Sequence, residues 1–162
     1  MTKQQFLSEL KKALNTVSEE VCEEILSDIS EHFSAAINNY AESVKLSTTA
    51  GNAKLTTNET GELRISSAAG NVKAEVTKIN GETKLTSSAG NIDLTAQEVA
   101  ANIRISTAAG STTVRLPRDA NCKIKAKKPV GGSLKNEITD NPQSPHVLKI
   151  SSAVGSIKIK AI

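Results

Sequence analysis

A sequence motif of alternating apolar and polar residues occurs five times along the chain. Its first copy spans residues 44–55 and turns at a small-residue corner that contains Gly51. Close copies follow at residues 63–74, 83–94, 103–114 and 148–159. Such alternation is typical of a strand with one buried face. A fixed period near 20 residues predicts a solenoid, in which stacked rungs share one core.

The corner glycines set the expected number of rungs. They fall at Gly51, Gly70, Gly90 and Gly110, and the next intact corner is Gly155. A degenerate copy, from residue 122 to residue 135, fits the gap and brings the count to six. We therefore predict a mainly β protein, a single-stranded parallel β-helix of about six rungs over residues 42–162. An antiparallel sandwich of hairpins with the same corners is the alternative.

Stacking the rungs in chain order predicts columns of similar side chains. We expect the corner glycines to have positive φ and Asn52, Asn71 and Asn91 to form an amide ladder. The carboxyl-terminal rung would end the stack without a cap. One expected inward column is Leu46, Ile65, Leu85, Ile105, Ile124 and Ile150, and Cys122 is expected beside Leu148 in another.

Residues 1–41 have a helical period instead. Thr2 and Gln5 have capping-box spacing, and a first apolar stripe follows them. We predict an α-helical hairpin over residues 1–41 that caps the first rung. The buried stripe of its second helix is expected to be Cys22, Ile25, Ile29, Phe33, Ala36, Ile37 and Tyr40.

Two family resemblances accompany these patterns. Residues 2–10, 19–28 and 31–33 resemble the HAAS-type helical module at the amino terminus of bacterial membrane signalling proteins. Residues 67–72 (SAAGNV) and 88–92 (SAGNI) resemble the adhesin-like β-helix family of bacterial envelope proteins, whose function is largely unknown. The resemblance implies a location at the cell envelope. The sequence itself has no signal peptide and no apolar run of membrane-spanning length.

Charge is distributed unevenly along the chain. Residues 1–42 carry 3 basic and 8 acidic side chains, residues 43–100 carry 6 of each, and residues 101–162 carry 11 and 3. Only three residues are aromatic, Phe6, Phe33 and Tyr40, which argues against nucleic acid as a ligand. Cys22 and Cys122 lie in different predicted units, so we expect buried thiols rather than a disulfide.

One outward column is cationic in every predicted rung: Lys45, Arg64, Lys84, Arg104, Lys123 and Lys149. Neighbouring strands lie about 4.8 Å apart, and adjacent like charges are unfavourable. Glu42, Glu62 and Glu82 shortly precede the first three cations and can neutralise them, whereas the last three have no such carboxylate. The predicted site for an anionic ligand is therefore Arg104, Arg115, Lys123, Lys125, Lys127 and Lys149.

These features predict a non-enzymatic binding or assembly module that engages an anionic envelope polymer, lipid headgroups or a protein partner. The simplest alternative is that the cations only keep a solvated β surface from aggregating. We also expect a homo-oligomer, through the carboxyl-terminal rung or through acidic helices that meet the basic end. An enzyme acting on polysaccharide is the remaining alternative, although the sequence has no metal-binding spacing, phosphate loop or nucleophile elbow. No catalytic residue, metal or cofactor is predicted.

Overall fold

The structure is a computed structural model that describes residues 34–162, and it is built from parallel strands. All strand pairs within this range are parallel, so the predicted solenoid is confirmed and the antiparallel sandwich is wrong. Residues 34–162 contain no helix, and hence none that could cross a membrane. The strands are β1 (Ser34–Ala50), β2 (Ala53–Ala69), β3 (Val72–Ile79), β4 (Thr83–Ala89), β5 (Ile92–Val99), β6 (Ile103–Ala109), β7 (Thr112–Leu116), β8 (Lys123–Ala126), β9 (Leu134–Asn136), β10 (Val147–Val154) and β11 (Ile157–Ala161).

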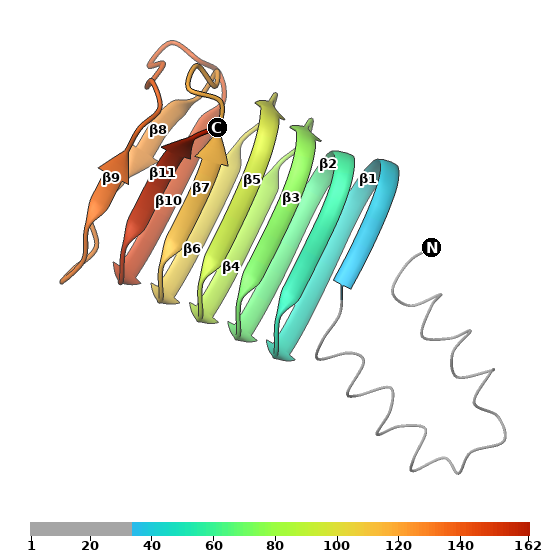
Figure 1. Cartoon of the computed structure of the whole chain (residues 1–162), viewed down its shortest axis with the longest axis horizontal. Coiled ribbons are helices and arrows are strands. Elements are labelled where there is room, and N and C mark those ends of the chain that lie inside the picture. Colours follow the sequence, from blue (N-terminus) through green and yellow to red (C-terminus); the bar gives the residue numbers. More distant parts are fainter. Residues whose placement is uncertain (1–33) are drawn as a thin grey trace, which may run out of the picture.

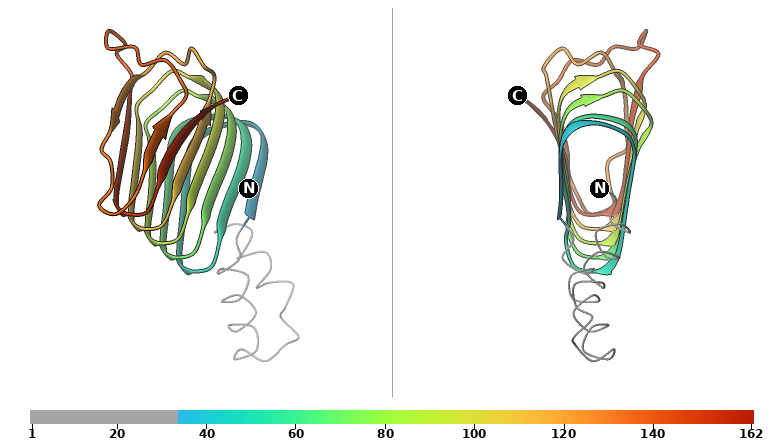
Figure 2. Two further views of the ribbon diagram at one scale, coloured as in Figure 1. Left: turned by 60° about the vertical axis from the view of Figure 1, so that its left-hand side comes forward. Right: turned by 90° about the vertical axis from the view of Figure 1, so that its right-hand side faces the viewer.

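The strands form two walls that are joined by tight corners (Figures 1 and 2). The first wall consists of the second halves of β1 and β2, followed by β4, β6, β10 and β8. The second wall begins with the first halves of β1 and β2 and continues through β3, β5, β7, β11 and β9. A rung is one strand of the first wall, a glycine corner and the next strand of the second wall. We number the six rungs in chain order.

The core lies between the walls and is built from stacked apolar columns. Leu46, Ile65, Leu85 and Ile105 pair in register from rung to rung, as predicted, and none is more than 6% exposed. The second wall contributes matching positions such as Leu94, which is fully buried. Because each rung covers the apolar face of its neighbour, burial depends on stacking.

The corner between the walls requires glycine. Gly70 and Gly90 have φ values of +130° and +138°, which side chains strongly disfavour. A Cβ atom at Gly90 would also overlap the carbonyl oxygen of Gly70 in the rung below. The predicted positive φ is confirmed at each corner: Gly51, Gly70, Gly90, Gly110 and Gly155.

The predicted amide ladder follows directly after these glycines. The Oδ1 atom of Asn52 accepts the backbone N–H of Asn71 at 3.0 Å, and Asn71 does the same for Asn91 at 3.0 Å. The side chain of Asn91 then accepts the N–H of Ser111 at 2.9 Å. Each bond joins two successive rungs, so the ladder holds their register at the corner.

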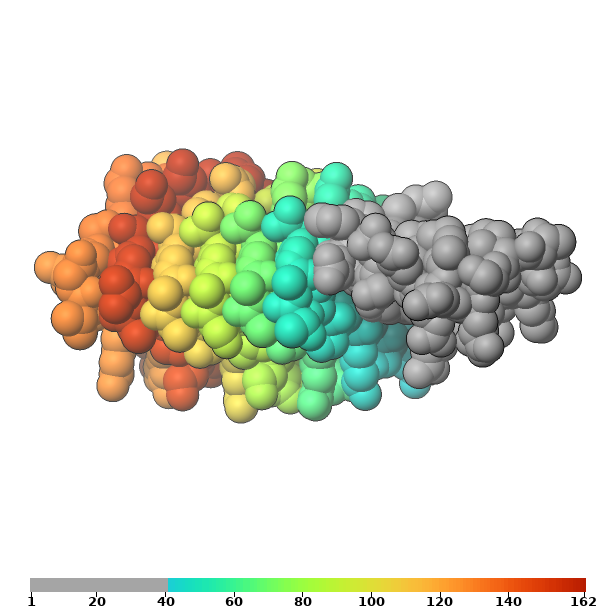
Figure 3. Space-filling model, turned by 90° about the horizontal axis from the view of Figure 1, so that it is seen from below, coloured from blue at the N-terminus to red at the C-terminus, as the bar shows by residue number. Residues whose placement is uncertain are grey.

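The sixth rung does not lie at the end of the stack. Its strand β10 pairs with β6 on one side and with β8 on the other, and β11 likewise lies between β7 and β9. In Figure 3 this red rung separates the yellow fourth rung from the orange fifth. The order in space is therefore 1, 2, 3, 4, 6, 5, which corrects the expected chain order.

The composition of the two rungs explains this order. Rung 6 has a neighbouring rung on each side, so its inward side chains must be apolar. Ile150, Ile157 and Ile159 meet this requirement and are at most 1% exposed. Rung 5 is covered on one side only, and there it tolerates the exposed Asn136 and a short β9 strand. The degenerate rung thus acts as the cap of the solenoid, and solenoids require such a polar end.

The expected dimer contact must be revised accordingly. Both edges of β10 and β11 are paired within the chain, so the carboxyl-terminal rung offers no strand edge to a second copy. The outer edge belongs to β8 and β9 instead. A homo-oligomer as such stays a prediction.

The solenoid begins earlier than the expected boundary at residue 42. Residues 34–41, assigned to the second helix by their period, form the start of β1 and pair with β2 from Ser34↔Lys54 onward. Their pairing shifts register between Ile37 and Tyr40, around two asparagines. The open edge of β2 supplies a partner that a local helical period does not reveal. The rest of the helical hairpin, with its proposed cap role, lies outside the described residues.

Candidate anion-binding face

The outward column of cations is present, with one replacement. Lys45, Arg64, Lys84 and Arg104 pair in register along the first wall, and Lys149 follows Arg104. In the outermost rung the partner of Lys149 is Lys125, whereas Lys123 pairs with Val147. We call the outer surface of the first wall the basic face. Its cation column is Lys45, Arg64, Lys84, Arg104, Lys149 and Lys125.

The correction arises from a register difference of two residues in rung 5. Stacking in chain order predicted Cys122 beside Leu148, but Ile124 lies there. Ile124 therefore leaves the column of Ile150, where Ala126 takes its place. Side chains alternate along a strand, so this shift keeps the lysines of β8 on the outer surface and only changes which one continues the column.

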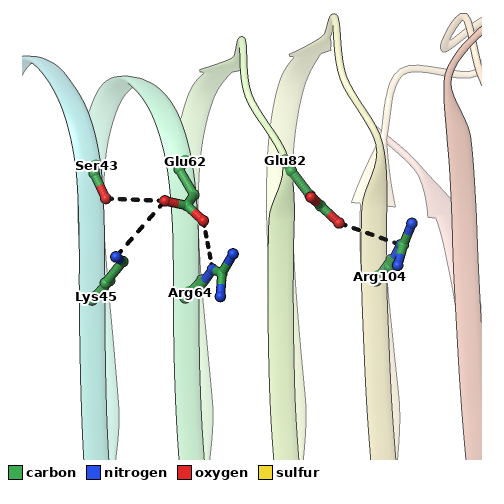
Figure 4. Close-up of polar contacts among 6 residues, drawn as sticks. All are labelled: Ser43, Lys45, Glu62, Arg64, Glu82 and Arg104. Atoms are coloured by element: carbon green, nitrogen blue, oxygen red, sulfur yellow. Dashed lines mark hydrogen bonds and ion pairs between the residues drawn. The ribbon is translucent and has the colours of Figure 1, made fainter.

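Glu62 neutralises the first two cations of the column. Its carboxylate lies 3.9 Å from Nζ of Lys45 and 2.5 Å from Nε of Arg64, and it also accepts a hydrogen bond from the hydroxyl of Ser43. In Figure 4, Glu62 lies on the same strand as Arg64, and its carboxylate is directed toward both cations. Ser43, rather than the predicted Glu42, pairs with Glu62 in register.

Glu82 reaches forward to the next rung. It lies 3.4 Å from Nε of Arg104 (Figure 4), whereas Lys84 forms no ion pair within the described part of the chain. The equivalent position in rung 4 is Asn102, whose side chain accepts the N–H of Val147 at 2.8 Å. Carboxylates therefore accompany the column only as far as rung 3, and Glu82 alone extends to Arg104.

The outer end of the basic face carries the highest density of cations. Lys123 and Lys125 alternate outward along β8, and Lys127 follows at the next outward position. Lys149 of the adjacent strand lies beside Lys125. None of these four lysines forms an ion pair with the residues that the structure describes.

Arg115 does not belong to this cluster. It lies on β7 in the second wall, on the opposite side of the solenoid, and its guanidinium is 3.3 Å from Asp93. Of the six predicted site residues, the structure thus brings five together on one wall: Arg104, Lys123, Lys125, Lys127 and Lys149. Arg115 follows the corner glycine of its rung, and this position in the sequence could have assigned it to the second wall.

The outer surface of the second wall, which we call the mixed face, holds many of its cations in ion pairs, although Lys54 and Lys158 form none with the described residues. Lys73 lies 2.8 Å from Glu75, and its hydrogen bond lowers the pKa of that carboxyl. Glu98 accepts a hydrogen bond from Lys78 at 2.9 Å and raises the pKa of the ammonium. These exposed pairs stabilise little, but they cancel charge locally.

The described residues offer little for chemistry beyond charge. No group of three metal-binding side chains occurs among residues 34–162. Cys122 is a free thiol with no exposed surface, and burial raises its pKa from 9.0 to about 11. It is therefore a protonated thiol at neutral pH, which makes it a poor nucleophile.

Comparisons with known proteins give two family matches. The HAAS family model matches residues 5–51, of which residues 34–51 include strand β1. No curated protein and no solved structure gives a match. The Toastrack DUF4097 family model matches residues 35–160, almost the whole solenoid. The chain therefore belongs to the Toastrack DUF4097 family, a family of unknown function.

Proposed function

We propose that this solenoid is a non-enzymatic binding module that holds an anionic polymer or surface against its basic face. The observation that carries the proposal is the cation column itself. Adjacent like charges oppose sheet formation, and on the mixed face carboxylates of the same wall hold several of the cations in ion pairs. The fold does not require a column of cations. A bound anionic ligand would neutralise the column and so account for it.

Edge protection does not account for the column. Lysines that guard a sheet against aggregation belong on edge strands, and Lys125 on β8 fits that role. Arg64, Lys84, Arg104 and Lys149 lie on strands that are paired on both sides. Their strand edges need no guard, so the recurrence of charge there favours recognition.

The cell envelope is the proposed location, and the resemblance of the repeat motifs to the adhesin-like family supports it. Anionic polymers and lipid headgroups are both abundant at such a surface, and the basic face would attract either of them. Fractionation of the cells that express the chain would test this location.

The function is tested by reversing two charges on each face. Lys125→Glu with Lys149→Glu should abolish retention of the full chain on dextran sulfate and on phosphatidylglycerol vesicles. Lys54→Glu with Lys158→Glu changes the net charge equally on the mixed face and should retain most binding. Thermal unfolding of both variants verifies that they fold. Equal losses in the two variants, or no loss in either, would contradict the proposal.

A further inference from the structure

We propose that the ligand is a linear phosphate-linked polymer that lies lengthwise along the cation column, at right angles to the strands. This inference rests on the proposed function and specifies the ligand of the same face. It follows from the shape of the charge distribution, from the side chains beside it and from the side chains that are absent.

The cations form a line, without a convergent pocket. Parallel pairing places one cation per strand at the same register position, and their side chains are well exposed, 55% for Arg64 and 61% for Arg104. With strands about 4.8 Å apart, five intervals make the column about 24 Å long. A single compact anion can contact two or three such groups, whereas an extended polyanion can contact all six.

A row of hydroxyl groups runs beside the cations. In five of the six rungs the outward residue two positions after the cation carries a hydroxyl, whereas in rung 5 it is Lys127. The five residues are Ser47, Ser66, Thr86, Ser106 and Ser151, and Ser151 donates to Ser106 at 3.4 Å. These groups share the period of the cations and can donate to oxyanions or accept from polyol hydroxyls. A phosphate-linked chain offers oxygens of both kinds along its length.

Ring stacking is not available on the basic face, whose strand segments all lie within residues 41–162. Residues 41–162 contain no aromatic side chain, and single-stranded nucleic acids are usually held by bases stacked on aromatic rings. A backbone of phosphates that lacks bases needs only point charges and hydroxyls. The two arginines of the column match the geometry of phosphate oxygens, and its four lysines supply compact charges on flexible stems.

A membrane surface fits the face less well. The large apolar side chains exposed among the described residues are Val130, Leu134, Val154 and Ile162. Val130 and Val154 pair at the glycine corner, Leu134 begins β9 and Ile162 follows β11, both on the second wall, so none lies within the cation column. Stable attachment to a bilayer combines basic charge with apolar groups that enter it, and the column supplies charge alone.

The positive charge of the basic face increases from rung 1 toward rung 5, so some rungs should bind the polymer more strongly than others. Glu62 and Glu82 accompany rungs 2 and 3, whereas Lys123 and Lys127 flank the column in rung 5. The polymer should therefore bind most strongly across rungs 4, 6 and 5. Binding then extends toward rung 1 only as far as it displaces exposed, weakly stabilising ion pairs.

The test uses inorganic polyphosphate of graded length as the probe. Binding of the full chain to pyrophosphate, tripolyphosphate and progressively longer chains is measured by titration calorimetry at one ionic strength. Per chain, affinity should rise at least about 10-fold between tripolyphosphate and chains that span the column, and then level off. Lys84→Ala should weaken the long chains while leaving tripolyphosphate unchanged. Lys54→Ala, on the mixed face, is its matched control.

The outcomes separate this inference from the proposed function. Equal affinity for tripolyphosphate and long chains would overturn the lengthwise mode and leave anion binding intact. Binding to phosphatidylglycerol vesicles without binding to polyphosphate would make a membrane the ligand and overturn the inference. The absence of binding to any of these probes would overturn both proposals.

Discussion

The basic face and the mixed face are built from the same rungs, yet they arrange charge differently. The basic face repeats a cation at one register position in all six rungs, with Glu62 and Glu82 beside the early ones. The mixed face also places some cations side by side, such as Lys54 and Lys73, but carboxylates are spread along it, as in the diagonal ion pair of Arg115 and Asp93. Strand register and core packing are common to both walls, so the fold alone does not dictate the column. The difference therefore points to what each surface contacts.

The largest expected effect is at the corner that both faces share. Gly90→Ala introduces a Cβ that overlaps the backbone of Gly70 and requires an unfavourable φ. We expect a loss of about 3 kcal/mol or more in unfolding free energy, with both surfaces disrupted together. Gly131→Ala is the control, because its Cβ meets no atom within 4 Å, and it should cost about 1 kcal/mol from its positive φ. Urea unfolding measures both, and similar losses would contradict the role of stacking.

A carboxylate placed on the basic face should make it resemble the mixed face. Ser151→Glu brings an acid beside Lys149 in the exposed hydroxyl row. We expect binding to polyphosphate to weaken about 10-fold, equivalent to about 1.4 kcal/mol, while thermal stability stays nearly constant. Thr113→Glu on β7 adds the same charge to the opposite wall. If that control weakens binding equally, net charge rather than the column is responsible.

Removal of a carboxylate should sharpen the difference between the faces. Glu62→Gln frees Lys45 and Arg64 from their shared partner. We expect polyphosphate affinity to rise about 3-fold, with a stability change below about 1 kcal/mol, because exposed pairs contribute little. Calorimetric titration would show the rise, and it should vanish at high salt. An unchanged affinity would mean that ligand does not reach rungs 1 and 2.

The smallest effect is expected on the mixed face. Asp93→Asn removes the partner of Arg115, and both side chains are 39% exposed. We expect a loss of about 0.5 kcal/mol in unfolding free energy and no change in polyanion binding. Enhanced binding by this variant would show that a cation on the second wall reaches the ligand, contrary to the separation of the two faces.

The repeated sequence motif made much of the fold predictable. Leu46, Ile65, Leu85 and Ile105 recur with one corner glycine between copies, and a shared period leaves one way to bury them together. The amide ladder followed from the same spacing, as the contact from Asn52 to Asn71 confirms.

The degenerate rung is where sequence reasoning failed. Without a clear corner motif, this copy was aligned two residues away from its actual register, so Lys123 replaced Lys125 in the predicted column. Arg115 was grouped by proximity in sequence to the other cations, although the intervening glycine corner turns β7 onto the second wall. A helical period likewise hid the strand character of residues 34–41.

The sequence by itself determined the repeat, the corners, the inward columns of the five intact rungs and the existence of a cation column, because alternation and period are local properties of the chain. Only the tertiary structure decided that rung 6 lies between rungs 4 and 5. That order depends on how much apolar surface each rung buries when both of its sides are covered. The intact rung with Ile150 and Ile159 satisfies this condition, whereas the lysine-rich rung with Asn136 remains stable only where one side meets water.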